Sequence, residues 1–154
     1  MKIEVTNMKP EIAAAMKAPG TSMDKMAEAM SDGYTKLMEY IAGQGRQIAG
    51  APYCCYMNAN EDFSQFDMEF GIPVNEAVPE QGGIFMSRTY EGEAVTATHK
   101  GAYKDLAVTY GAMMNYVKDN SLTLTGVYYD YYISNPADTP EAEMLTQVLF
   151  PIKG

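Results

Sequence analysis

The strongest candidate for chemistry in this sequence is an acidic residue flanked by tyrosines. Tyr128, Asp130 and Tyr132 occupy alternate positions of a tyrosine-rich run that follows Gly126. Alternate side chains of an extended strand point to one face, so the carboxylate would lie between two aromatic rings. A carboxylate attracts a cation by charge, and aromatic ring faces attract the same cation. The run therefore predicts a site for an organic cation. The alternative is a surface strand whose acid faces water between exposed tyrosines.

A second feature is that one pattern occurs twice along the chain. The segment 34–41 (YTKLMEYI) matches 110–117 (YGAMMNYV), and each is followed at the same spacing by a glycine and a tyrosine-rich run. This repetition predicts that one supersecondary unit is used twice, with Tyr56 equivalent to Tyr132. A seam between two copies is a natural place for a ligand groove.

Four further residues are candidate ligand contacts. Tyr56 would face the groove from the first copy, and Tyr110 lies in the middle of a predicted helix face, where an ordinary core position is the alternative. Glu69 alternates with phenylalanines, so it faces the groove or solvent if those rings face the core. Gln147, the repeat equivalent of Glu69, has an amide that can hydrogen-bond a ligand but cannot neutralise a charge.

Other residue types that often carry chemistry are sparse. The sequence has two cysteines, Cys54 and Cys55, and one histidine, His99. Adjacent residues of a strand point to opposite faces, which argues against a disulfide framework or a metal site built on this pair. His99 precedes a Gly-Ala-Tyr segment at a predicted strand end, and we interpret it as a local hydrogen-bonding residue rather than a base. We therefore expect no metal and no cofactor.

Length and charge restrict the class of protein and its partners. The 154 residues, 47% of them hydrophobic, are enough for one domain with a substantial core. The net charge of −9 predicts that nucleic acid is not a direct partner, because a phosphate-binding surface needs basic residues. No run of apolar residues is long enough to span a membrane, and the sequence MKIEVT at the start lacks a signal-peptide core. We expect a cytoplasmic protein with no membrane partner.

Hydrophobic periodicity predicts an α+β domain. Apolar residues spaced by three and four positions predict helices over 22–44, with Ser22 as the N-cap, and over 103–119. The expected strands are 3–6, 12–17, 53–58, 66–74, 84–90, 94–100, 127–134 and 144–152. Each half then reads strand, strand, helix, strand, strand, and the segment 75–83 joins the two halves. We expect a surface loop at 135–140.

Four segments of the sequence resemble the GyrI-like small-molecule-binding domain, which is also found as the effector-binding domain of AraC-type and MerR-type transcription activators. They are 66–74 (FDMEFGIPV), 98–103 (THKGAY), 126–136 (GVYYDYYISNP) and 140–152 (PEAEMLTQVLFPI). The resemblance covers almost the whole chain. It implies a single domain, 1–154, built as two pseudo-symmetric β-α-β-β-type repeats, about 1–74 and 84–154. The implied fold has an antiparallel sheet, two long helices and a groove between the repeats.

The resemblance also implies a function. In the family an acid on the strand after the second helix faces the pocket; Asp130 stands at that position and is one methylene shorter than the usual Glu. Gln147 stands where many relatives carry Glu. The implied protein is a stand-alone binder of a small organic molecule, cationic or amphipathic. One alternative is a hydrolase of small strained or electrophilic compounds, with Asp130 or Glu69 as general base and a tyrosine as acid. Another is an interaction protein that binds a regulator or DNA gyrase through its acidic surface.

Overall fold

The computed structural model describes residues 2–135 and 138–153, and these form eight strands, two α-helices and two short 3-10 helices. The chain divides into two compact units. Unit 1 comprises Met1–Met8 and Glu91–Gly154, and unit 2 comprises Lys9–Tyr90. The α+β class predicted from the sequence is confirmed. Within the described part of the chain, no helix is both long and apolar enough to cross a membrane.

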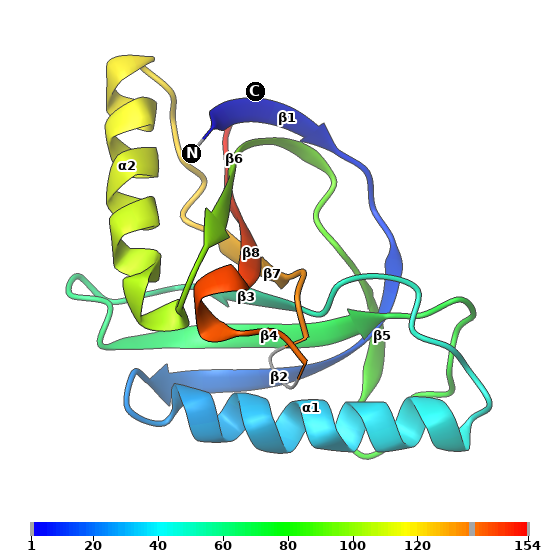
Figure 1. The fold of residues 1–154 in the computed structure, drawn as a ribbon. Helices are drawn as coiled ribbons and strands as arrows, with labels where there is room; N and C mark the ends of the chain where they lie inside the picture. The colour runs from blue at the N-terminus through cyan, green and yellow to red at the C-terminus, as the bar shows by residue number, and fades with distance from the viewer. Residues whose placement is uncertain (1, 136–137, 154) are drawn as a thin grey trace. The chain divides into compact units, whose positions relative to one another are not determined.

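Unit 1 is a four-stranded antiparallel sheet with one long helix. The strands are β1 (Ile3–Met8), β6 (Gly92–Lys100), β7 (Tyr128–Tyr132) and β8 (Leu145–Pro151), in the order β1-β6-β8-β7. Helix α2 (Leu106–Asp119) follows the 3-10 helix η1 (Tyr103–Asp105) and lies against β6 (Figure 1). A second 3-10 helix, η2 (Glu141–Glu143), precedes β8.

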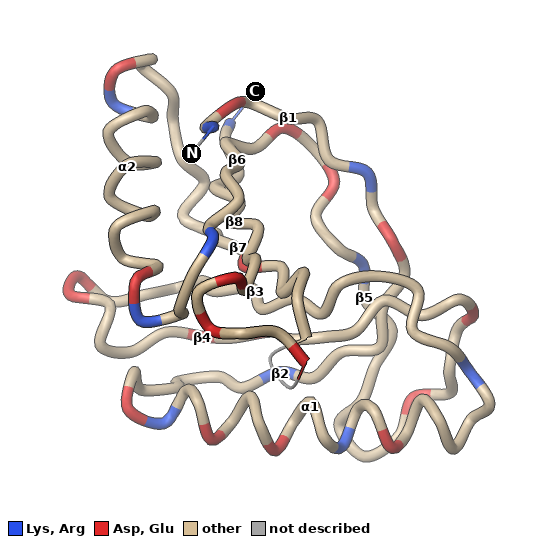
Figure 2. Tube along the Cα trace, in the orientation of Figure 1, with Lys and Arg blue, Asp and Glu red and all other residues tan. Residues whose placement is uncertain are grey.

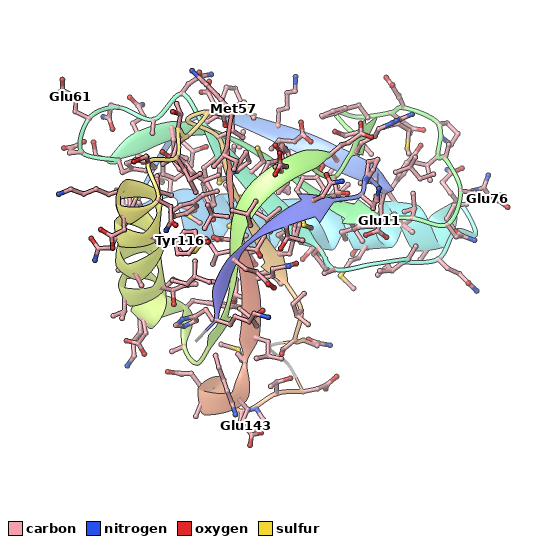
Figure 3. All side chains as sticks on the ribbon, turned by 90° about the horizontal axis from the view of Figure 1, so that it is seen from above. Glu11, Met57, Glu61, Glu76, Tyr116 and Glu143 are labelled. Carbon is pink, nitrogen blue, oxygen red and sulfur yellow. The ribbon has the colours of Figure 1, made fainter. Side chains whose placement is uncertain are left out.

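The core of unit 1 lies between α2 and one face of this sheet. Three residues of α2, Leu106, Met113 and Val117, lie on one helical face because their spacing follows the helical repeat. They pack with side chains of β6 and β8, among them Val95 and Val148, which are fully buried. Figure 3 shows all side chains and labels Tyr116, which lies on the strand side of α2 and packs against this cluster. The α2-facing side of the sheet is therefore an interior surface.

Unit 2 repeats this arrangement with its own helix. The strands β2 (Ile12–Ser22), β3 (Tyr53–Met57), β4 (Gln65–Pro73) and β5 (Phe85–Arg88) are antiparallel in the order β3-β4-β2-β5. Helix α1 (Met26–Gly43) lies along β2 and β4 (Figure 1). Gly33 of α1 sits directly on the ring of Phe70, so the helix approaches the sheet closely at that point.

The predicted start of the first helix is wrong. Ser22 is not its N-cap but the last residue of β2, where it pairs with Gln65 of β4. The helix begins at Met26, and Lys25 is the N-cap. The strand continues past the Pro-Gly dipeptide because a bulge between Ala18 and Thr21 absorbs it, as bulges commonly do for proline. The other predicted helix and strands are present with shifted ends, although residues 136 and 137 of the expected surface loop lie outside the described residues.

The ends of the two helices carry the same hydrogen bonds. Arg46 N–H donates to the Ile41 carbonyl after α1, and Leu122 N–H donates to the Val117 carbonyl after α2, both at 3.0 Å. Positive φ values occur at equivalent positions in both turns, 69° at Gly45 and 54° at Ser121. Such a residue ends a helix by satisfying its last carbonyls. This agreement supports the interpretation of a duplicated unit.

The two units do not coincide with the two halves of the sequence, because each half contributes one strand to the other unit. β1 precedes α1 in the chain but pairs with β6, from Ile3 opposite Ala97 to Met8 opposite Gly92. β5 precedes α2 but pairs with β2, with Phe85 opposite Ala15. Each unit therefore takes its fourth strand from the other half of the sequence.

Candidate functional site

Asp130 is a buried acid on the helix-facing side of unit 1. It lies on β7 opposite Val148 of β8, a residue of the α2 core cluster, and only 2% of its surface is exposed. The Tyr110 hydroxyl of α2 donates a hydrogen bond of 2.7 Å to Asp130 Oδ2. The interpretation of Asp130 as a surface acid facing water is therefore wrong. Tyr110 and Asp130, both predicted as ligand contacts, meet across the helix–sheet interface.

Several aromatic rings pack together on the helix-facing side of unit 1. The rings of Tyr110 and Tyr128 lie against Phe150 of β8, with centroid distances of 6.1 and 5.1 Å. The ring of Tyr132 lies edge-on to Tyr103 of η1 at 5.6 Å. Burial raises the pKa of the Tyr103 and Tyr128 phenols above the usual value, so both remain neutral at physiological pH. The alternation of Tyr128, Asp130 and Tyr132 predicted from the sequence does place all three on one face.

Helix α2 contributes no charge to this region. Between residues 106 and 117 it has no Lys, Arg, Asp or Glu, and its charged residues, Lys118 and Asp119, stand at its C-terminal end (Figure 2). Helix α1, in contrast, carries charged residues along its length. One polar group that α2 presents to Asp130 is the phenol of Tyr110, which stabilises the carboxylate by hydrogen bonding.

Gln147 faces the other side of the unit 1 sheet. It lies opposite Thr98 of β6 and Tyr131 of β7, one position away from the core residue Val148. Adjacent strand residues point to opposite faces, so Gln147 points away from α2. It lines a shallow hollow of about 280 Å³. The other lining residues are Lys2, Glu4, Thr6, Thr96, Ala97 and Thr98. Asp130 is not among them, so these two predicted contacts belong to different surfaces of the unit.

Glu69 belongs to unit 2 and is the centre of a polar cluster. Its Oε2 accepts hydrogen bonds of 2.7 Å from the hydroxyls of Tyr53 and Ser87. Gly71 makes room for this contact, because a Cβ there would lie 2.9 Å from the Tyr53 hydroxyl. Lys17 is opposite Glu69 in the strand register, but its Nζ lies over the Phe85 ring, 5.4 Å from the centroid. The cluster therefore consists of a half-exposed carboxylate and the two hydroxyl groups that donate hydrogen bonds to it.

Tyr56 lies on the helix-facing side of unit 2, where its ring packs edge-on against Phe66 at 5.4 Å. The two helix-facing sides differ at the position of the acid. Cys54 is the repeat equivalent of Asp130, and its thiol contacts the Met68 sulfur at 3.6 Å. Tyr34, the equivalent of Tyr110, donates to the backbone carbonyl of Tyr53 instead of a carboxylate. At these two positions, 76 residues apart in the sequence, a phenol donates to a carboxylate in unit 1 and to a backbone carbonyl in unit 2.

His99 ties the end of β6 to the start of the helical segment. It is 7% exposed, its Nε2 lies 3.0 Å from the Ala102 carbonyl, and its Nδ1 lies 2.7 Å from the Thr109 hydroxyl. A carbonyl only accepts, so Nε2 carries a proton and, in the neutral ring, Nδ1 accepts from Thr109. Both nitrogens have structural partners, which agrees with the predicted local role rather than that of a base.

Sequence reasoning missed two members of the aromatic group. Tyr103 and Phe150 were assigned to a helix and a closing strand, and not to the surroundings of Asp130. Tyr103 precedes α2 in η1 and reaches Tyr132, and Phe150 faces α2 from β8. The available signal was the alternation along β8, which places Phe150 on the same face as Val148.

Comparison with known proteins identifies the family. The family model described as the GyrI-like small molecule binding domain matches residues 1–153. No match was found among curated proteins. Among solved structures, the C-terminal domain of EcmrR superposes with a TM-score of 0.85 at 20% identity, covering 99% of this chain and 97% of that chain. SAV2435 bound to tetraphenylphosphonium superposes with a TM-score of 0.63 at 13% identity, covering 100% and 95%.

A further neighbour, described as a hydrolase from Listeria innocua, superposes with a TM-score of 0.67 at 12% identity, covering 99% of this chain and 92% of that chain. At these identities the solved structures establish the fold alone. The match of the family model, in contrast, extends over almost the entire sequence. The chain belongs to the GyrI-like small molecule binding domain family.

Proposed function

We propose that this protein binds a small amphipathic organic cation whose positive charge lies beside Asp130. The observation that carries the proposal is the burial of this carboxylate, 2% exposed, against a neutral phenol and within a group of aromatic rings. Opposite charges attract one another more strongly in a buried, less polar environment than in water. A cation that binds beside Asp130 would gain from this attraction.

The aromatic rings suit the rest of such a ligand. Tyr128 and Tyr132 lie on the same strand face as Asp130, and their ring faces attract cations as well as apolar groups. Because Asp130 is nearly inaccessible in the described structure, a ligand must displace neighbouring side chains to reach it. Tyr103 is 38% exposed and packs edge-on against Tyr132, so these two rings are the outer layer that would move.

The structural neighbours support this choice of ligand. SAV2435 shares the fold and was solved with tetraphenylphosphonium, an organic cation with four apolar rings. That molecule is a suitable probe, because it combines a delocalised positive charge with apolar surface and has no hydrogen-bonding group.

A hydrolase is the second candidate function. The observation that favours it is the cluster in which the hydroxyls of Tyr53 and Ser87 both donate to Glu69 Oε2. A carboxylate within hydrogen-bonding distance of a hydroxyl is the geometry required for general-base catalysis. A neighbour described as a hydrolase shares the fold. This function places the chemistry in unit 2 and away from Asp130.

The proposal predicts that Asp130→Asn weakens tetraphenylphosphonium binding by about tenfold or more, because the substitution keeps the shape of the side chain and removes its charge. Triphenylphosphine oxide, a neutral molecule of related shape, should lose little affinity. Isothermal titration calorimetry on both compounds measures the difference. Asp119→Asn is the matched control: it removes one acid from the exposed end of α2 and should leave both affinities unchanged.

Two results would contradict the proposal. Equal losses for the cation and the neutral compound would show that Asp130 acts on the structure of the unit rather than on ligand charge. The hydrolase would be favoured if the wild type hydrolyses an electrophilic ester, the Asp130→Asn variant keeps this activity and the Glu69→Gln variant loses it.

A further inference from the structure

Thr146 has a buried hydroxyl that forms no hydrogen bond within the described residues. It lies on β8, its exposed fraction is 0%, and its Oγ1 lacks a partner. Buried polar groups are nearly always hydrogen-bonded, because an unsatisfied one loses its water without compensation. Valine has almost the same shape and would fill this position without that cost. The hydroxyl is therefore not explained by packing.

The strand register places Thr146 beside the Asp130 site. Thr146 is directly opposite Tyr132 on β7 and opposite His99 on β6. Asp130 is opposite Val148, two positions further along β8, so Thr146 and Asp130 share one face of the sheet. Diagonal neighbours of this kind are about 7–8 Å apart, which a single small molecule can span.

His99, the residue opposite Thr146 on β6, has no ring nitrogen free to bond its hydroxyl. Both ring nitrogens of His99 are already engaged, one by the Thr109 hydroxyl and the other by the Ala102 carbonyl. The next residue of β8 on this face is the core residue Val148, which is apolar. Because Thr146 is directly opposite Tyr132, a ligand of Asp130 that displaced the ring of Tyr132 would come next to this hydroxyl.

We infer that Thr146 is a specificity-determining residue of the Asp130 site, and that its hydroxyl hydrogen-bonds an oxygen carried by the ligand. The inference rests on the proposed function and narrows it. The ligand is a cation with a hydroxyl, ether or carbonyl group several bonds from its charge, and not a purely hydrocarbon cation. A site with a buried polar group discriminates against ligands that leave that group unpaired.

Two matched cations test the inference: hydroxypropyl triphenylphosphonium and butyl triphenylphosphonium, which differ by a terminal hydroxyl in place of a methyl group. The wild type should prefer the hydroxylated cation by about tenfold in calorimetry, because only that ligand pairs with Thr146. Thr146→Val should abolish the preference by weakening the hydroxylated cation alone. The same substitution should raise the melting temperature of the free protein, since it removes an unsatisfied hydroxyl.

Two control variants separate this role from general effects on the sheet. Thr146→Ser keeps the hydroxyl and should keep the preference. Thr98→Val changes an exposed threonine of β6 on the face away from α2 and should alter neither affinity.

Three results would overturn the inference: equal affinities of the wild type for the two cations, equal losses for both in Thr146→Val, or a lower melting temperature of that variant. The last would mean that the hydroxyl is satisfied in the free protein, for example by a buried water. Failure of the proposed function is a different result, in which neither cation binds the wild type or Asp130→Asn leaves both affinities unchanged.

Discussion

Gly33→Ala is expected to destabilise the protein by about 3 kcal/mol, since the added methyl group would overpack a closed interface. A Cβ at this position would lie 2.1 Å from Cε2 and 2.2 Å from Cζ of Phe70. Phe70 cannot easily move, because it is 3% exposed and its ring packs against Tyr34 at 5.3 Å. Either α1 must withdraw from β4 or the ring must leave its place, and both lose buried apolar contacts.

The same substitution in the other helix should have the opposite sign. Gly111 of α2 is exposed, and a Cβ there would have no neighbour within 4 Å. Alanine is favoured over glycine in a helix interior by about 1 kcal/mol, so Gly111→Ala should stabilise the protein. Urea denaturation of the two variants measures both changes. Similar stability changes for the two would show that α1 does not approach Phe70 as closely as described.

Tyr110→Phe is expected to cost about 2 kcal/mol of stability, because it removes a hydrogen bond to a buried charged group. The phenylalanine ring preserves the contact with Phe150, so the loss reports on the hydroxyl and Asp130. The effect should nearly disappear when Asp130 is already replaced by alanine, since the phenol then has no carboxylate to stabilise. Urea denaturation of the single and double variants gives this coupling.

Tyr116→Phe is the control within the same helix. Tyr116 also packs on the core of unit 1, but no hydrogen bond of its hydroxyl is found among the described residues. Its removal should change stability by less than about 0.5 kcal/mol, the range of uncoupled substitutions. If Tyr110→Phe costs no more than Tyr116→Phe, or costs the same with and without Asp130, the carboxylate–phenol pair does not contribute as described.

The strand part of the site was predictable because alternation is a local property. Tyr128, Asp130 and Tyr132 are alternate residues, so they must share a face if the segment is a strand. The structure confirms that it is a strand. The contact between Asp130 and Tyr110 was not predictable. This contact depends on the position of α2 along the sheet. That position is set by packing against side chains from several strands.

Alternation shows which residues share a face but not which face is the interior one. Glu69 was assigned to a groove or to solvent, and the structure makes it the acceptor for two hydroxyls of its own unit. Gln147 lies in an apolar strand and faces away from α2, whereas Asp130 lies in a tyrosine-rich strand and faces toward it. Neither strand pattern alone indicates which of its two faces is covered by the helix. The start of α1 was misplaced because a bulge allowed β2 to continue through Pro19 and Gly20. The unsatisfied state of Thr146 likewise emerges only from three-dimensional packing.

The most direct test of a cation site beside Asp130 is to locate tetraphenylphosphonium on the protein by NMR. Intermolecular nuclear Overhauser effects would be measured between the phenyl protons of the cation and assigned side chains. If the cation binds beside Asp130, we expect contacts with the rings of Tyr128 and Tyr132, which lie on the Asp130 face of the unit 1 sheet. Contacts confined to the opposite faces, at Thr98 beside Gln147 or at Ser87 beside Glu69, would contradict it.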